Sequence, residues 1–137
     1  MLVEWAYHKE INALITRHRG AYSGAEFQQA ITDIIPSLGV VPNLFILDGR
    51  EVDQADMYDS DRAKVAFTIR NLEVSTPGMV KKSLIDVSYI EMIQSGSELH
   101  IRVNKMFEEN GIIRNISMAK DWATVEDLIG IHFTPPW

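Results

Sequence analysis

The spacing of hydrophobic and polar positions changes along this chain, and the first change marks a hairpin. Val3 to Tyr7 and Ile11 to Arg17 are mainly apolar segments of strand length, and they flank the polar turn His8-Lys9-Glu10. Short strand-like segments joined by a tight polar turn are typical of antiparallel pairs. We therefore predict that the chain opens with two strands.

The pattern then shifts to helical spacing. Ser23 followed by Glu26 fits a capping box, in which each residue satisfies a free backbone N–H of the other at a helix start. The apolar positions after it recur at the spacing of one helix face: Phe27, Ala30, Ile31, Ile34 and Leu38. Pro36 and Gly39 are predicted to end this helix.

A continuous apolar run, Leu44-Phe45-Ile46-Leu47, follows the first helix and ends at Asp48-Gly49-Arg50. Such a run indicates a strand, Asn43 to Asp48, that is buried on both faces, as in a parallel sheet. Asp48 and Arg50 are then expected at the carboxyl end of that strand, where open α/β sheets bind their ligands.

Helices and strands alternate through the rest of the chain. A second helix is predicted to begin near Ser60 and a third at Gly96-Ser97, with a strand from Ser83 to Tyr89 between them. The second helix has an apolar inner face: Val65, Ala66, Ile69 and Leu72. The third helix is predicted to end at Asn110-Gly111. Its apolar inner face consists of Leu99, Val103, Met106 and Phe107.

A strand from Ile112 to Met118 and a last helix complete the pattern. That helix carries Trp122, Val125 and Ile129 on one face and closes at Gly130. The order β-β-α-β-α-β-α-β-α predicts an α/β fold with a mixed, mostly parallel five-stranded sheet and about four helices. We expect one domain over residues 1–130 and a loosely attached, Pro-rich tail over residues 131–137.

Composition narrows the functional classes. The 137 residues carry a net charge of −6, which disfavours nucleic-acid and anionic membrane surfaces. There is no Cys, so disulfides and thiolate metal sites are excluded. No signal peptide is visible and no apolar run approaches the roughly 20 residues that span a bilayer. We expect a cytoplasmic protein with no cofactor and no membrane insertion.

Other candidate chemistry in the sequence is weak. Asp53, Asp56, Asp59 and Asp61 lack the spacing and central Gly of a calcium loop, so a solvated acidic loop is favoured over a metal site. The histidines are expected at the surface or in turns, because no two have metal-ligand spacing: His8, His18, His100 and His132. Asp48 and Arg50 either bind a ligand or pair with each other, and pairing is favoured.

The layout of the chain resembles the STAS fold of anti-sigma-factor antagonists, and especially its SpoIIAA-like branch of small bacterial proteins. The resemblance rests on the opening strands, on Gly20 to Phe27, on LFILDGR, and on IIRNISMAKDWATVEDLIG. Asp48-Gly49-Arg50 is similar to the end of the family's middle strand. The resemblance implies a non-catalytic domain that binds a protein or a small ligand.

In anti-sigma-factor antagonists a Ser at the start of the second helix is phosphorylated by a partner kinase, which breaks the complex. Asp59-Ser60 falls at the corresponding place, and the resemblance makes Ser60 a candidate phosphosite. The family pattern continues with a small residue, Gly and an apolar residue, whereas this chain has Asp61-Arg62-Ala63. The alternative for Ser60 is a helix N-cap, and the cap is favoured.

The functional prediction is a non-enzymatic binding or regulatory module that contacts a partner protein through the second helix and the acidic loop before it. Phe67 is expected off the core face of that helix and is a candidate interface residue. Phe133 and Trp137 are also expected to lie off the predicted core faces. A homodimer is expected. The alternative is a carrier of a small ligand such as a lipid or nucleotide, lined by flexible methionines: Met57, Met79, Met92 and Met106. An enzyme ranks last, because no nucleophile–base pair can be named.

Overall fold

The computed structural model of the protein describes residues 2–53, 59–78, 80, 82–87, 98–132 and 137. Its strands are β1 (Leu2–His8), β2 (Ala13–Ala21), β3 (Leu44–Asp53), β4 (Ser83–Val87) and β5 (Asn115–Ala119). Its helices are α1 (Gly24–Leu38), α2 (Asp59–Ser75), α4 (Glu98–Glu109) and α5 (Trp122–Ile129), with a single 3₁₀ turn, η1, at Lys9–Ile11. The predicted α/β fold and the predicted order of elements are confirmed.

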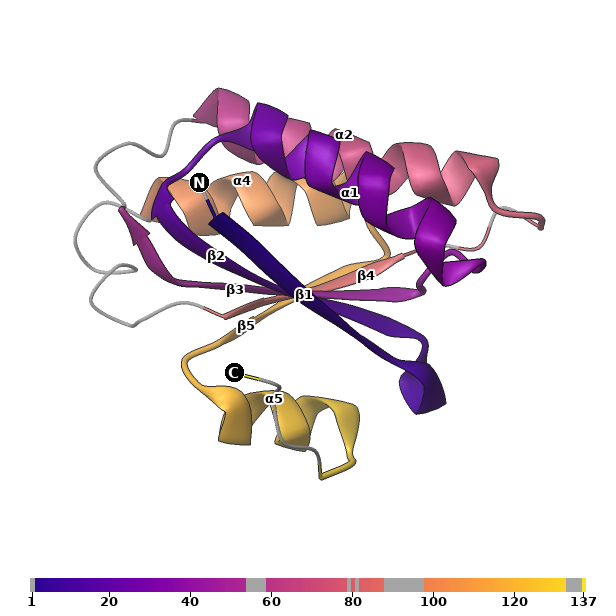
Figure 1. Ribbon diagram of the computed structural model, residues 1–137. Helices are drawn as coiled ribbons and strands as arrows, with labels where there is room; N and C mark the ends of the chain where they lie inside the picture. The colour runs from indigo at the N-terminus through magenta and orange to yellow at the C-terminus, as the bar shows by residue number, and fades with distance from the viewer. Residues whose placement is uncertain (1, 54–58, 79, 81, 88–97, 133–136) are drawn as a thin grey trace.

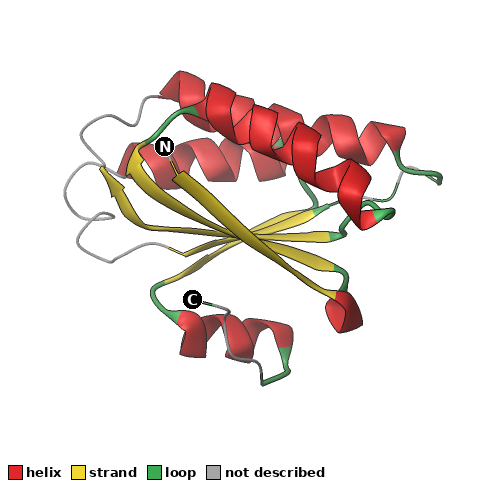
Figure 2. Ribbon diagram, viewed as in Figure 1, coloured by secondary structure: helices red, strands yellow, loops and turns green. Residues whose placement is uncertain are grey.

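The five strands lie in the sheet in the same order as in the chain, β1-β2-β3-β4-β5. β1 is antiparallel to β2, and the other neighbours are parallel. Connections between parallel strands are right-handed almost without exception. Each parallel strand is added on the same side of the strand before it, so the connecting helices α1, α2 and α4 all cover one face of the sheet. Helix α5 lies on the other face (Figure 1; Figure 2).

Each face of the sheet has its own hydrophobic core. The larger core lies under α1, α2 and α4 and is built around fully buried side chains such as Phe27, Phe45 and Ile69. The smaller core lies under α5 and contains Ile15, Ile46, Ile85, Val87 and Val125, among others. The continuous apolar run of β3 is explained by this arrangement, because its residues alternate between the two cores.

Helix α1 begins as predicted, since the Ser23 side chain accepts a hydrogen bond from the backbone N–H of Glu26 at 3.2 Å. It ends at Gly39, which has a left-handed φ of 73°. The prediction that Pro36 ends the helix is wrong, because α1 continues through it to Leu38. Pro36 lacks the N–H that would bond to the Thr32 carbonyl, but this is a single lost hydrogen bond and Gly39 closes the helix within the same turn.

Strand β3 is longer than predicted, and this changes the place of Asp48-Gly49-Arg50. The ladder with β4 stops at Asp48, opposite Val87, but β2 runs on to Ala21 and keeps pairing with β3 as far as Asp53. Arg17 of β2 pairs with Asp48 and Arg19 pairs with Glu51, so β3 has one more residue than β2 between these two pairs. The segment therefore contains a β-bulge inside the strand, and the prediction that the strand ends at Asp48 is wrong.

Smaller differences occur elsewhere. β2 starts at Ala13 and not at Ile11, because η1 occupies the turn and Asn12 adopts a left-handed conformation. Met106 was predicted on the inner face of α4, but 49% of it is exposed, whereas Phe107 is buried as predicted. The side chains of Leu99 and Val103 lie outside the described residues.

The carboxyl-terminal tail is attached at its last residue. The ring of Trp137 lies 6.2 Å from that of Trp122, measured between centroids, and Trp137 packs against the core under α5. The loose attachment predicted for residues 131–137 is therefore wrong for Trp137. No described helix has the length and apolarity needed to cross a membrane.

Helices α1 and α2 approach each other closely at Gly24. A Cβ atom placed there would lie 2.7 Å from the backbone oxygen of Asp61 and 2.8 Å from its Cα. The backbone N–H of Gly24 also donates to the Asp61 carboxylate at 2.8 Å. Glycine is therefore required for this approach, and the contact ties the starts of the two helices together.

We expect Gly24→Ala to destabilise the protein by about 1–3 kcal/mol, because the added methyl must push backbone atoms apart. Ala25→Ser, one residue along the same helix, is the control, since Ala25 is exposed. Chemical denaturation of both variants measures the difference. A Gly24→Ala variant as stable as the wild type would contradict the close approach.

Candidate functional site

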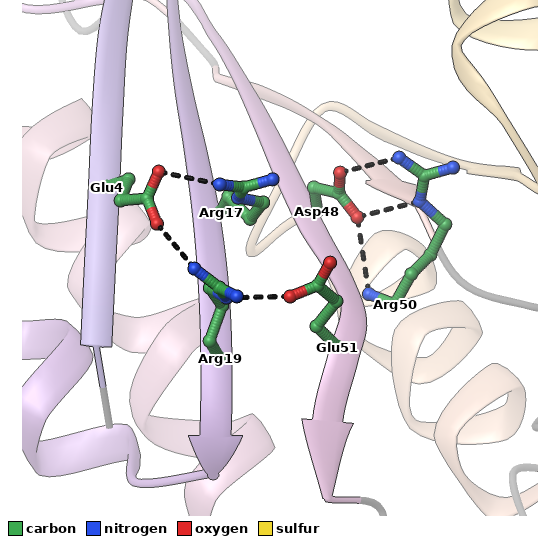
Figure 3. Close-up of polar contacts among 6 residues, drawn as sticks. All are labelled: Glu4, Arg17, Arg19, Asp48, Arg50 and Glu51. Carbon is green, nitrogen blue, oxygen red and sulfur yellow. Dashed lines mark hydrogen bonds and ion pairs between the residues drawn. The ribbon is translucent and has the colours of Figure 1, made fainter. Parts of the chain in front are cut away.

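Six charged side chains lie across β1, β2 and β3 on the face of the sheet that carries α5 (Figure 3). Five of them come from positions that the register places opposite one another, and Arg50 lies between Asp48 and Glu51. Glu4 of β1 is paired with Arg17 of β2, and Arg17 and Arg19 are in turn paired with Asp48 and Glu51 of β3. Opposite charges at directly facing positions stabilise neighbouring strands.

Glu4 and Glu51 hold the two arginines of β2. The Glu4 carboxylate accepts from Arg17 Nη2 at 2.8 Å and from Arg19 Nη1 at 3.3 Å, and Glu51 accepts from Arg19 Nε at 2.6 Å. The hydrogen bond from Arg17 is the main reason that the pKa of Glu4 is lowered. The negative charge of Glu51 is the main reason that the pKa of Arg19 is raised. These pairs are half-exposed, so solvent screens them.

Asp48 and Arg50 form the most extensively hydrogen-bonded pair of the row. Asp48 Oδ1 accepts from Arg50 Nε at 2.9 Å and from the Arg50 backbone N–H at 3.2 Å, while Oδ2 accepts from Nη2 at 2.8 Å. Asp48 is only 1% exposed. The guanidinium of Arg50 lies 5.9 Å from the centre of the Trp122 ring. Mutual pairing, the alternative favoured by the sequence, is therefore present, and ligand binding by the pair stays a prediction.

A hollow of about 100 Å³ lies beside this pair, lined by Arg17, Asp48, Arg50 and Glu51. Its size suits a few water molecules. Arg17 Nε is buried without a hydrogen-bond partner, and its guanidinium lies 5.2 Å from the centre of the Trp137 ring. The carboxylates of the row balance the charges of its guanidinium groups, so this surface has no strong net electrostatic field. What it offers to a ligand is the N–H donor of Arg17 Nε.

A second polar cluster, which sequence reasoning missed, is buried on the opposite face beneath α2 and α4. Arg62 Nε donates to Asn104 Oδ1 at 2.7 Å, and Arg62 Nη2 donates to Asp86 Oδ2 at 2.8 Å. The exposed fraction of each of the three residues is 5% or less. Two features of the sequence could have revealed this cluster. Arg62 lies four residues before Ala66 and so falls on the apolar face of α2, and Asp86 is a charged residue within an apolar strand.

His18 is buried near this cluster. Its Nε2 lies 2.8 Å from Thr16 Oγ1, and its ring lies 5.9 Å from that of Tyr22. His18 Nδ1 and Tyr22 Oη are buried without a hydrogen-bond partner. Burial lowers the pKa of His18 to about 4 and raises that of Tyr22. The prediction of a surface or turn histidine is wrong for His18, because β2 extends past Arg17 and points this ring into the larger core.

The sheet separates Ser60 and Phe67 from the charged row, since α2 lies on the opposite face (Figure 1). α2 begins at Asp59, so Ser60 lies inside the first turn, and the N-cap alternative is wrong for it. Ser60 is exposed, and Phe67 is exposed as predicted, with 49% of its surface accessible. The side chain of Asp59 lies outside the described residues.

The acidic loop before α2 is described only at its ends, since residues 54–58 lie outside the described part of the chain. Asp61, expected to be solvated, instead binds the Gly24 backbone N–H. Among the described residues, no group of three His, Asp or Glu side chains is arranged to hold a metal ion.

We expect Asp48→Asn to lower the free energy of unfolding by about 1.5–3 kcal/mol, because it weakens charge-assisted hydrogen bonds to a buried group. Glu51→Gln, the matched control in the exposed part of the row, should cost less than about 1 kcal/mol. Urea titration of both variants measures the two costs. Equal costs would contradict the special position of Asp48.

Stability should depend on pH through His18. Its folded pKa of about 4 lies below the usual 6.5, so the unfolded chain binds a proton first as the pH falls. The stabilising contribution, about 3 kcal/mol, is therefore complete above pH ~6.5 and is lost between pH ~6.5 and ~4.

In His18→Gln this loss should disappear from urea titrations across the same pH range. His132→Gln is the control, because the His132 side chain is 84% exposed. A His18→Gln variant whose stability falls as steeply as that of the wild type would show that other groups cause the loss.

Comparison of the chain with protein-family models, with curated proteins and with solved structures yielded no match. The STAS-like resemblance of the sequence is thus a prediction that these comparisons leave untested.

Proposed function

We propose that this protein is a non-enzymatic regulatory module of the STAS, SpoIIAA-like type that binds a partner protein through the outer surface of α2. The observation that carries the proposal is a row of exposed side chains on that helix. Ser60, Phe67 and Val74 are seven residues apart, which is about two turns, so they lie on one stripe. Phe67 and Val74 are 49% and 54% exposed.

Phe67 has the properties of an interface anchor. Its ring meets the buried ring of Phe107 edge to face, with the centroids 6.1 Å apart. That contact fixes the orientation of Phe67 while about half of its surface stays accessible. Large aromatic side chains that are held in place in this way supply much of the binding energy at protein interfaces.

A groove beside the stripe offers a place for the partner. It lies between α1 and α2, measures about 270 Å³, and has a partly apolar lining with Ile31, Ile35 and Leu72. Grooves between packed helices suit an amphipathic helix, which lays its apolar face into them. We therefore propose that the partner presents such a helix to α1 and α2.

Ser60 would make this surface switchable. It lies at the amino-terminal end of the stripe, about 10 Å along the helix axis from Phe67. A phosphate there would add nearly two negative charges next to Asp61, and a partner matched to the unmodified surface would be repelled. This is the mode of regulation that the family resemblance implies.

The alternative, a small-ligand carrier, has less support. Three of the four methionines proposed as its lining lie outside the described residues, and Met106 is largely exposed. The hollows at the charged row, beside β5 and between α1 and α2 measure about 100, 190 and 270 Å³. Small-molecule pockets are usually about 300–1,000 Å³, so these surfaces favour a protein partner.

The experiment places a photo-crosslinking amino acid at position 67 in the native cell and identifies the crosslinked protein by mass spectrometry. The purified partner is then titrated against Phe67→Asp. We expect its affinity to fall by about tenfold or more, because a charge replaces the aromatic anchor. Ser60→Asp should weaken binding in the same direction.

Leu128→Asp is the matched control, since Leu128 is 48% exposed and lies on α5, across the sheet. It should leave the affinity unchanged. If position 67 captures no protein, or if Phe67→Asp and Leu128→Asp bind the partner equally, the proposal is wrong.

A further inference from the structure

The free edge of β5 has an unusual composition for an edge strand. β5 is the last strand of the sheet, and no described strand lies beyond it. Its five residues, Asn115–Ala119, include no charged residue and no Pro. Sheets normally protect such edges with charges or Pro, because the free backbone groups are a template for another strand. β5 itself carries no such protection.

A side chain from α4 supplies the protection instead. The backbone N–H of Ile116 donates to Oε2 of Glu108 at 2.6 Å. A carboxylate oxygen thus takes the place that the carbonyl oxygen of a neighbouring strand would occupy. Because Glu108 is exposed, a competing backbone acceptor can displace it without disturbing the core.

A groove of about 190 Å³ runs between α4 and this edge, lined by Asn104, Lys105, Glu108, Ile116 and Met118. Ile116 and Met118 are half-buried and pair with Leu84 and Asp86 of β4, so their side chains lie on the face covered by α4. In an added strand every second side chain points to that face. Those side chains would enter the groove.

We propose that β5 and α4 form a peptide-binding site that takes an extended, basic segment of a partner protein by strand addition. A carbonyl of the peptide replaces Glu108 as the acceptor for Ile116 N–H. The displaced carboxylate is then free to pair with a Lys or Arg of the peptide, which gives the charge preference. This site lies away from the α2 stripe and does not depend on the function proposed for it.

The test uses random linear peptides displayed on phage, selected on the wild-type protein and then synthesised. We expect enriched peptides that contain Lys or Arg and that slow hydrogen exchange of the Ile116 amide when bound. Glu108→Lys should weaken their binding about tenfold, because it replaces attraction by repulsion. Glu109→Lys makes the same charge change at the next, also exposed, position and should bind as the wild type does.

A second measurement leaves the protein unchanged. Methylating the backbone nitrogens of alternate peptide residues removes the donors that strand addition needs, so one of the two alternate methylation patterns should abolish binding. The proposal is overturned if no peptide is enriched, if both methylated peptides bind normally, or if bound peptides leave Ile116 exchange unchanged. A dimer in sedimentation that Glu108→Lys dissociates would also overturn it, because the occupant would then be a second copy.

Discussion

The handedness of the connections between parallel strands determines most of this structure. Strands β2 to β5 are added in chain order on the same side, so each right-handed connection places its helix on the same face of the sheet. Of the helices that the structure describes, α1, α2 and α4 cover one face and α5 covers the other. The larger core and the partial exposure of the charged row follow from this unequal covering. It also leaves β5 at one edge of the described sheet.

The two polar clusters differ in how much they hold the fold together. Arg62, Asp86 and Asn104 come from α2, β4 and α4 and are almost fully buried, so losing one partner would leave a desolvated charge. Glu4, Arg19 and Glu51 lie in partial contact with water, where ion pairs contribute little. The buried cluster therefore positions three elements relative to one another, while the outer row chiefly selects the pairing of β1, β2 and β3.

The order of elements and the inner face of α2 could be predicted because they depend on local spacing. Val65, Ala66 and Ile69 repeat at helical intervals, and all are buried. The length of β3 could not be predicted, because Asp48-Gly49-Arg50 has the composition of a turn and stays in the sheet only through the extended ladder with β2. The same nonlocal pairing buries His18.

The candidate site was predictable only in part. The pairing of Asp48 with Arg50 could be predicted, because the two residues are only two positions apart in the sequence. The row that joins them to Glu4 and Arg17 depends on strand register, which no pattern in the chain specifies. Likewise, Arg62 and Asn104 are 42 residues apart, and only the packing of α2 beside α4 brings them together.

The bulge in β3 reverses the parity of that strand. Before it, Leu44 and Ile46 face α5 while Phe45 and Leu47 face the larger core; after it, the even-numbered Val52 faces the larger core. The extra residue thus allows Asp48 and Glu51, three positions apart, to share the α5 face. A regular strand of the same length, without the bulge, would direct Glu51 to the larger core and Val52 to the α5 face. The bulge therefore decides which of these two side chains is buried under the three helices.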